Sequence, residues 1–203
     1  MQLYDGGRAP NPRRVRIFLA EKGISVPLAP VDLGSLQQRS AAYTAINPMQ
    51  RLPALELDDG TVLTESIAIC RYFEELQPEP PLFGKGALEK ARIEMWQRRM
   101  ELHFLALVSH VFRNSHPAMK EMEVPQVPEW AEANKPRIAE FLNFLDRELA
   151  TRAFVAGDHY SVADITGLVA VDFMKPAKLT LPDGMDNVRR WHAEISARPS
   201  AKA

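Results

Sequence analysis

A proline-rich segment at residues 77–81 divides the chain into two parts with different patterns. It reads Gln-Pro-Glu-Pro-Pro, so three of the last four positions are proline. Proline has no backbone N–H and fixes φ, so this segment cannot continue a helix and remains extended. We therefore expect one domain at residues 1–77, a linker at 78–85 and a second domain at 86–203.

The first part alternates short strand patterns with helical patterns. A helix is expected from Pro12, which suits a first turn, to Lys22, because Gly23 is typical of a helix end. Two alternating runs around Asp59-Gly60 predict a β-hairpin, since glycine accepts the positive φ of the turn. The expected strands span residues 1–4, 26–33, 52–57 and 61–64, and the expected helices 12–22 and 66–76. Residues 37–46 are expected to form a short polar helix or an irregular turn. This β-α-β-α-β-β-α order predicts a mixed four-stranded sheet of the thioredoxin-like type.

The second part contains only helical patterns, so the fold class is α/β plus all-α. Helices are expected at residues 88–112, from Pro128 or Trp130 to 149, and at 161–174 and 187–197, with a break or kink in the second near Pro136. Along the first of these helices, one stripe combines apolar residues with two histidines. Its members are Ile93, Trp96, Met100, His103, Leu107 and His110. Ser161 and Asp164 have the spacing of a capping box, which makes Asp164 a folding element rather than a catalytic acid.

Composition excludes several classes of function. A formal net charge of -1 predicts no general attraction to nucleic acid or to an anionic membrane. The chain has no apolar run long enough to span a membrane, and its first residues do not resemble a signal peptide. The single cysteine, Cys70, rules out an intrachain disulfide and fits a cytoplasmic location. The histidines show no ligand spacing, so we expect no metal site.

Three segments together resemble the cytosolic glutathione transferase superfamily. The run Arg8–Gly23 is similar to its first loop and helix, and Asn47–Ile69 to its glutathione-binding stretch. The run Ala156–Ile165 is similar to a helix start in its C-terminal domain. The resemblance covers nearly the whole chain, in the right order. It implies that the chain binds glutathione and acts in detoxification as a homodimer.

The resemblance assigns two pairs of residues to glutathione. In the family, the proline equivalent to Pro53 is cis, and Leu52 pairs antiparallel with the cysteinyl backbone of glutathione, a small case of strand addition. An ordinary strand start is the alternative for this pair.

Ser66 is expected to be a helix N-cap, where free amides attract a carboxylate, while Glu65 suits the ammonium of the γ-glutamyl end. The alternative here is a plain helix cap with a solvated glutamate.

The glycine carboxylate of glutathione needs a cation or an amide. Gln38, Arg39 and Arg51 are the candidates, and the resemblance does not choose between Gln38 and Arg39. A solvated surface role is the alternative for each. Asn11 is a further candidate glutathione contact, as a donor to the sulfur: the backbone around Pro10-Asn11-Pro12 is a poor source of N–H groups, because two of the three residues are prolines, but Asn11 itself can contribute.

The group that activates the glutathione thiol is not evident. The family's Ser or Cys would stand at Ala9, which has no side-chain donor. Tyr4, near the end of the first strand, is one substitute, although a packing role is the alternative. The resemblance to an atypical fungal and bacterial branch suggests instead that His103 and Ser109 hold a water against the sulfur. On a straight helix, residues six apart lie about 120° and about 9 Å apart, so a bridging water or a bent helix is required. A buried structural histidine is the alternative for His103.

These observations predict a glutathione transferase that conjugates the thiolate to a small electrophile. Two alternatives remain open. One is a non-catalytic glutathione-binding module, which the missing donor at Ala9 motivates. The other is a glutathione-dependent peroxidase, isomerase or lyase on the same scaffold. The sequence does not identify the electrophile.

Overall fold

The chain folds into two compact units. A computed structural model describes residues 1–203, and its contacts separate Met1–Leu82, with Lys202–Ala203, from Phe83–Ala201. No helix is long and apolar enough to cross a membrane.

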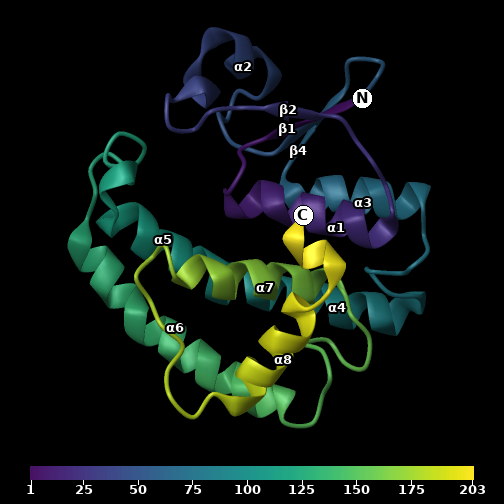
Figure 1. Cartoon of the computed structure of the whole chain (residues 1–203), viewed down its shortest axis with the longest axis vertical. Coiled ribbons are helices and arrows are strands. Elements are labelled where there is room, and N and C mark those ends of the chain that lie inside the picture. The colour runs from purple at the N-terminus through teal and green to yellow at the C-terminus, as the bar shows by residue number, and fades with distance from the viewer. The chain divides into compact units, whose positions relative to one another are not determined.

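The first unit is built on a four-stranded sheet in the order β2-β1-β3-β4. Strands β1 and β2 are parallel, whereas β1 with β3 and β3 with β4 are antiparallel. Helices α1 and α3 lie side by side against one face (Figure 1). The strands are β1 (Gln2–Asp5), β2 (Leu28–Pro30), β3 (Ala54–Glu56) and β4 (Val62–Thr64), and the helices are α1 (Pro10–Lys22), the 3₁₀ turn η1 (Gln37–Arg39), α2 (Ala41–Ile46) and α3 (Ser66–Leu76). The predicted mixed sheet and hairpin are confirmed.

Several predicted boundaries in this unit are wrong, and two of them have a clear physical reason. Strand β2 is shorter than the expected residues 26–33, because Pro27 and Pro30 cannot donate to the sheet and Leu28 is 51% exposed on an edge strand. Helix α1 starts at Pro10 rather than Pro12, and Gly23, with φ 66°, ends it as expected.

A buried lysine at the end of α1 holds the proline-rich segment. Lys22 Nζ donates to the carbonyl oxygens of Gln77 at 2.8 Å and Pro80 at 2.5 Å, and it lies 2.5 Å from Glu74 Oε2. In return, Gln77 Nε2 donates to the Lys22 carbonyl at 2.5 Å. The start of the segment is therefore fastened to α1 and α3 by a cation with no exposed side-chain surface.

The second unit is entirely helical. Its helices are α4 (Gly86–Met100), the π turn η2 (Glu101–Leu105), α5 (Ala106–Ser115), the 3₁₀ turn η3 (Pro117–Met119), α6 (Pro128–Leu149), α7 (Val162–Met174), α8 (Asp186–Ser196) and the 3₁₀ turn η4 (Pro199–Lys202). The break expected near Pro136 is wrong, because α6 runs through that residue without interruption. Pro136 lies on the exposed side of α6, while Asn134 and Ile138 are buried and hold the helix in place.

The long helix predicted at residues 88–112 contains a π turn. Glu101–Leu105 joins α4 to α5 with i→i+5 bonding, so the chain continues but its side chains rotate relative to an ideal α-helix. The stripe predicted along this helix is only partly buried: Met100 is fully buried, but His103 is exposed. The buried structural role considered for His103 is therefore wrong.

The predicted capping box at the start of α7 is confirmed. Asp164 Oδ2 accepts hydrogen bonds from the backbone N–H and the hydroxyl of Ser161, both at 3.0 Å. Asp164 Oδ1 accepts from Val155 N–H at 3.0 Å and from Trp191 Nε1 at 2.9 Å. This buried carboxylate thus joins the start of α7 to Trp191 on α8 and to Val155 in the loop before α7.

Candidate functional site

One edge of the sheet brings together the segments predicted to bind glutathione. Ala54 pairs with Thr64 and also with Tyr4, so Leu52-Pro53, Glu65-Ser66 and the loop after β1 all lie at the same end of the sheet. A Cβ placed on Gly6 would come within 3.0 Å of Leu52 Cδ1, so this loop packs closely against Leu52. Because β2 is parallel to β1, the segment after β2 starts at this end too.

Leu52 is buried but leaves its own backbone groups unpaired. It is 8% exposed, and neither its N–H nor its carbonyl oxygen has a hydrogen-bond partner within the protein. Two unpaired backbone groups on one residue suit an extended ligand that supplies a donor and an acceptor. The peptide bond from Leu52 to Pro53 is cis, as expected.

The start of α3 differs from the expected cap. Glu65, not Ser66, is the N-cap residue, and no side chain caps the helix. Ser66 is the first helical residue, so its role as N-cap is a wrong prediction. Glu65 has φ 64° and ψ 115°, an unfavourable backbone conformation for a residue with a side chain. The Ser66 hydroxyl and the exposed Glu65 carboxylate have no partner within the protein. The first-turn amides, the hydroxyl and the carboxylate thus remain available at this edge.

Two residues that sequence analysis did not single out hold the peptide before Leu52. The Arg51 carbonyl oxygen accepts hydrogen bonds from Tyr43 Oη at 2.7 Å and from Asn47 Nδ2 at 2.8 Å. Asn47 Oδ1 accepts from Met49 N–H at 3.0 Å. Burial raises the pKa of Tyr43 to about 12, so its hydroxyl keeps its proton. The asparagine of the Asn47-Pro48 pair was the only available sequence signal for this arrangement.

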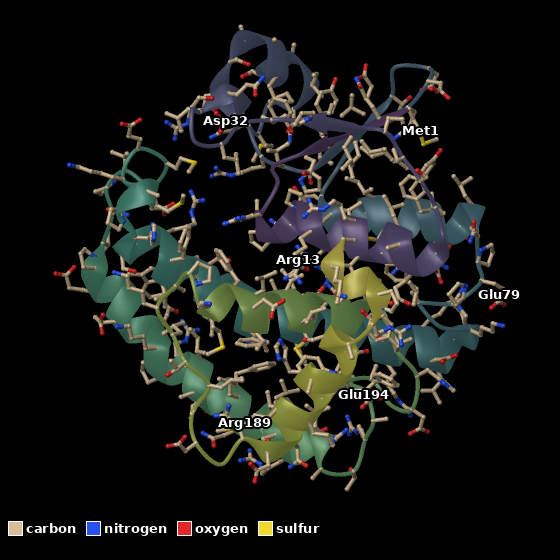
Figure 2. The ribbon with its side chains drawn as sticks, viewed as in Figure 1. Met1, Arg13, Asp32, Glu79, Arg189 and Glu194 are labelled. Carbon is tan, nitrogen blue, oxygen red and sulfur yellow. The ribbon has the colours of Figure 1, made fainter.

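The other predicted glutathione contacts lie on segments that approach this edge. Asn11, exposed at the start of α1, accepts a hydrogen bond from Arg14 Nη2 at 2.8 Å through Oδ1. Gln38 is 3% exposed, whereas Arg39 and Arg51 are exposed. Asp32, labelled in Figure 2, fixes the turn that leads to Gln38 and Arg39, because its Oδ1 accepts from Gly34 N–H at 2.8 Å.

Tyr4 does not have the environment of a thiol activator. Its hydroxyl donates to Glu56 Oε2 at 2.7 Å and accepts from Gln2 Nε2 at 2.9 Å. Burial and the hydrogen bond to Glu56 raise the pKa of Tyr4. The phenol proton is therefore already engaged, which agrees with the structural role considered for this residue.

In the second unit, His103 lines a groove between the long helix and α6. The imidazole stacks on Phe141 with ring centres 6.4 Å apart. The groove has a volume of about 440 Å³. It is lined by His103, Leu107, Arg137, Glu140, Phe141, Phe144 and Arg147.

Ser109 lies away from this groove. Its hydroxyl donates to the Leu105 carbonyl at 2.8 Å. Leu107 lines the groove, and two α-helical steps rotate a side chain by about 200°, so Ser109 lies on the other side of α5. The structure therefore does not bring His103 and Ser109 together. The bound hydroxyl of Ser109 can still accept a hydrogen bond but has no second proton to donate.

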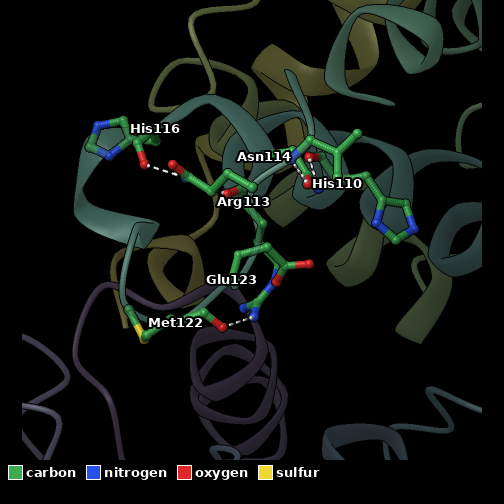
Figure 3. Close-up of polar contacts among 8 residues, drawn as sticks. His110, Arg113, Asn114, His116, Met122 and Glu123 are labelled. Atoms are coloured by element: carbon green, nitrogen blue, oxygen red, sulfur yellow. Dashed lines mark hydrogen bonds and ion pairs between the residues drawn. The ribbon is translucent and has the colours of Figure 1, made fainter. Parts of the chain in front are cut away.

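The segment after α5 is held by a set of polar contacts (Figure 3). Arg113 Nε lies 2.5 Å from Glu123 Oε2, and Arg113 Nη2 donates to the Met122 carbonyl at 3.1 Å. Gln126 Nε2 donates to the carbonyl oxygens of Arg113 at 2.7 Å and His116 at 3.0 Å. The loop that follows α5 is therefore fastened to the end of that helix.

No group of three or more His, Cys, Asp or Glu side chains is placed to hold a metal ion. Cys70 is buried on α3, and burial raises the pKa of its thiol to about 12. A thiol that stays protonated is a poor nucleophile, so Cys70 does not supply the chemistry of the site.

Family models and known proteins agree with this arrangement. The model for the glutathione S-transferase N-terminal domain matches residues 9–76, and the model for the C-terminal domain matches residues 95–199. Glutathione S-transferase 2 of Saccharomyces cerevisiae is 37% identical over 205 residues, which cover 100% of this chain and 88% of the yeast protein. The crystal structure of Gtt2 from Saccharomyces cerevisiae aligns with a TM-score of 0.95 at 36% identity, covering 100% of this chain and 99% of that one. Maleylacetoacetate isomerase of Pseudomonas aeruginosa is 43% identical over 94 residues, 45% of this chain and 44% of that protein.

The chain thus belongs to the cytosolic glutathione S-transferase superfamily. The family and the fold class predicted from the sequence are confirmed, with a thioredoxin-like first domain followed by a helical domain.

Proposed function

We propose that this protein is a glutathione transferase that binds glutathione on its first unit and conjugates the thiolate to small electrophiles. The observation that carries the proposal is the pair of unpaired backbone groups on buried Leu52, within a domain that matches the family model. An extended cysteinyl backbone offers the matching acceptor and donor. The relatives named as glutathione S-transferases support the same reaction.

The other proposed glutathione contacts lie near Leu52, within a glutathione-binding domain at residues 1–77. A linker at residues 78–85 follows, and the domain at 86–203 would supply the pocket for the electrophile. Leu52 supplies main-chain pairing, and Pro53 shapes the chain beside it. Ser66 and the first-turn amides of α3 receive the γ-glutamyl carboxylate, and Glu65 receives the ammonium. The remaining proposed contacts are Asn11, Gln38, Arg39 and Arg51.

For thiol activation we propose His103 or Ser109, acting through a bound water. Because His103 and Ser109 lie on different sides of the long helix, a single water does not bridge the two side chains in this conformation. Replacing the active residue with alanine should raise the pKa of bound glutathione, read from thiolate absorbance against pH. The other alanine variant then serves as the control, and unchanged titrations in both variants would remove both residues from the mechanism.

The reaction is tested by turnover of 1-chloro-2,4-dinitrobenzene together with calorimetry of glutathione binding. Saturable turnover with measurable binding is expected. Binding without turnover on this or other electrophiles would favour a non-catalytic glutathione-binding module, and no binding at millimolar glutathione would overturn the proposal.

A glutathione-dependent isomerase is a second candidate. The stretch of 94 residues that is 43% identical to a maleylacetoacetate isomerase favours it. Turnover of a maleyl substrate above that of aromatic halides would select this candidate, and a hydroperoxide assay would test the peroxidase alternative. By family expectation the protein is a cytoplasmic homodimer that acts in detoxification. Sedimentation analysis tests whether it is a dimer.

A further inference from the structure

The peptide between Arg51 and Leu52 is fixed from one side by two side chains. Tyr43 Oη and Asn47 Nδ2 both donate to the Arg51 carbonyl oxygen, at 2.7 and 2.8 Å. Tyr43 is 4% exposed and Asn47 is 2% exposed, so both bonds form away from bulk water. Two buried donors use both lone pairs of this oxygen and fix the orientation of the peptide plane.

The orientation of that carbonyl determines where the Leu52 N–H points. This peptide is not among the cis bonds, and in a trans peptide the C=O and N–H groups point in opposite directions. With the Arg51 oxygen directed at α2, the Leu52 N–H is directed away from α2. It has no partner within the protein.

The surroundings of the two donors are themselves rigid. Tyr43, Val31 and Leu52 form one buried cluster, and the Tyr43 ring also packs edge-on against Tyr4 at 5.7 Å. Asn47 accepts from Met49 N–H at 3.0 Å through its side-chain oxygen, which fixes its amide so that Nδ2 faces Arg51. Neither donor can rotate without losing packing or a second bond.

We propose that Tyr43 and Asn47 are positioning residues that hold the Arg51–Leu52 peptide so that the Leu52 N–H is presented to the cysteinyl carbonyl of glutathione. This inference rests on the proposed function, and it adds residues that act on the ligand only through the backbone. Pre-orientation removes the need to order this peptide during binding, so the effect falls on glutathione affinity. The electrophile makes no use of this peptide.

The test uses the full-length protein with two substitutions. Tyr43→Phe removes one donor without changing shape. Asn47→Asp keeps the acceptor for Met49 N–H but turns a carboxylate oxygen toward the Arg51 carbonyl. We expect the KM for glutathione to rise about 3- to 10-fold in Tyr43→Phe, the range of one neutral hydrogen bond, and further in Asn47→Asp. The KM for 1-chloro-2,4-dinitrobenzene and the turnover number at saturating glutathione should stay within about 2-fold.

Tyr72→Phe is the matched control, because Tyr72 lies on α3 and its hydroxyl makes no hydrogen bond. Its kinetic constants should match the wild type. In protein labelled with ¹⁵N-leucine, glutathione should shift the Leu52 amide proton downfield, and Tyr43→Phe should reduce that shift. This readout would not respond to a merely structural role.

The outcomes separate the two proposals. Wild-type protein that binds no glutathione overturns the proposed function. The positioning role alone is overturned if the wild type binds glutathione but Tyr43→Phe has the wild-type KM for glutathione and the wild-type shift of the Leu52 amide proton. If Asn47→Asp does not fold, as judged by thermal unfolding, Tyr43→Phe decides by itself.

Discussion

Tyr4 directs its phenolic proton at Glu56, with 2.7 Å between Tyr4 Oη and Glu56 Oε2. This is a cross-strand contact, since Gln2 and Glu56 are paired on β1 and β3 and Tyr4 lies two residues along the same strand. The raised pKa of Tyr4 follows from burial and from the neighbouring carboxylate. This hydrogen bond gives Tyr4 a structural role that does not involve activation of the glutathione thiol.

We therefore expect Tyr4→Phe to keep its turnover number within about 2-fold of the wild type and to leave the pKa of bound glutathione unchanged. The loss of two partly buried hydrogen bonds, one donated to Glu56 and one accepted from Gln2, should cost about 1–3 kcal/mol of stability. Rate against pH and urea unfolding measure the two effects. Turnover slower by about two orders of magnitude, the scale of a lost catalytic proton donor, would show that this tyrosine acts on the thiol after all.

Lys22 should be one of the most sensitive positions for stability in the first unit. Lys22→Met removes the ammonium that lies beside the buried Glu74 carboxylate and that donates to the carbonyls of the proline-rich segment. Removing one partner of a buried ion pair costs about 3–5 kcal/mol. Urea unfolding checks this value, with exposed Lys90→Met as control, expected to change stability by less than about 0.5 kcal/mol. Equal stability of the two variants would contradict this role.

The sequence predicts elements whose signals are local. The Asp59-Gly60 hairpin and the helix from Ser66 to Leu76 follow from turn chemistry and periodicity, and both are found. The Leu52 and Ser66 segments are also found at one sheet edge, because the pairing of Ala54 with Thr64 follows from the hairpin.

Features that depend on tertiary contacts could not be predicted in this way. The π turn at Glu101–Leu105 has no residue pattern of its own, and it invalidates the straight-helix geometry used for His103 and Ser109. The bonds from Tyr43 and Asn47 to Arg51 join side chains to a backbone carbonyl through packing, which periodicity does not report. The cap at Glu65 was missed because a non-glycine residue with φ 64° opposes local preference.

Cys70 should make the stability of the protein fall in alkaline solution. Burial raises the pKa of this thiol to about 12 in the folded state, while an unfolded cysteine has a pKa of about 8.5. Above about pH 8.5 the unfolded chain loses this proton and the folded chain keeps it, so the native state becomes less favoured as pH rises. Between pH 8 and pH 10 the loss from this group is about 2 kcal/mol.

The measurement compares urea unfolding of the wild type and Cys70→Ala at pH 8 and pH 10. The wild type should lose about 2 kcal/mol more than the variant over this interval. The native protein should also react slowly with a thiol reagent at pH 8 and rapidly once unfolded. Fast labelling of the native protein, or parallel stability curves for the two proteins, would contradict the burial argument.

Asp164 should stabilise the second unit without affecting glutathione. Its carboxylate accepts from the N–H groups of Val155 and Ser161 and from Trp191 Nε1, all buried. Asp164→Ala leaves these donors unsatisfied, and each costs about 1–3 kcal/mol, so we expect a total loss of at least about 3 kcal/mol. Asp158→Ala, an exposed aspartate a few residues earlier, is the matched control and should change stability by less than about 0.5 kcal/mol. The folded fraction of Asp164→Ala at low temperature should keep the wild-type KM for glutathione, because this carboxylate lies in the second unit. A large rise in that KM with little loss of stability would instead place Asp164 in the catalytic machinery.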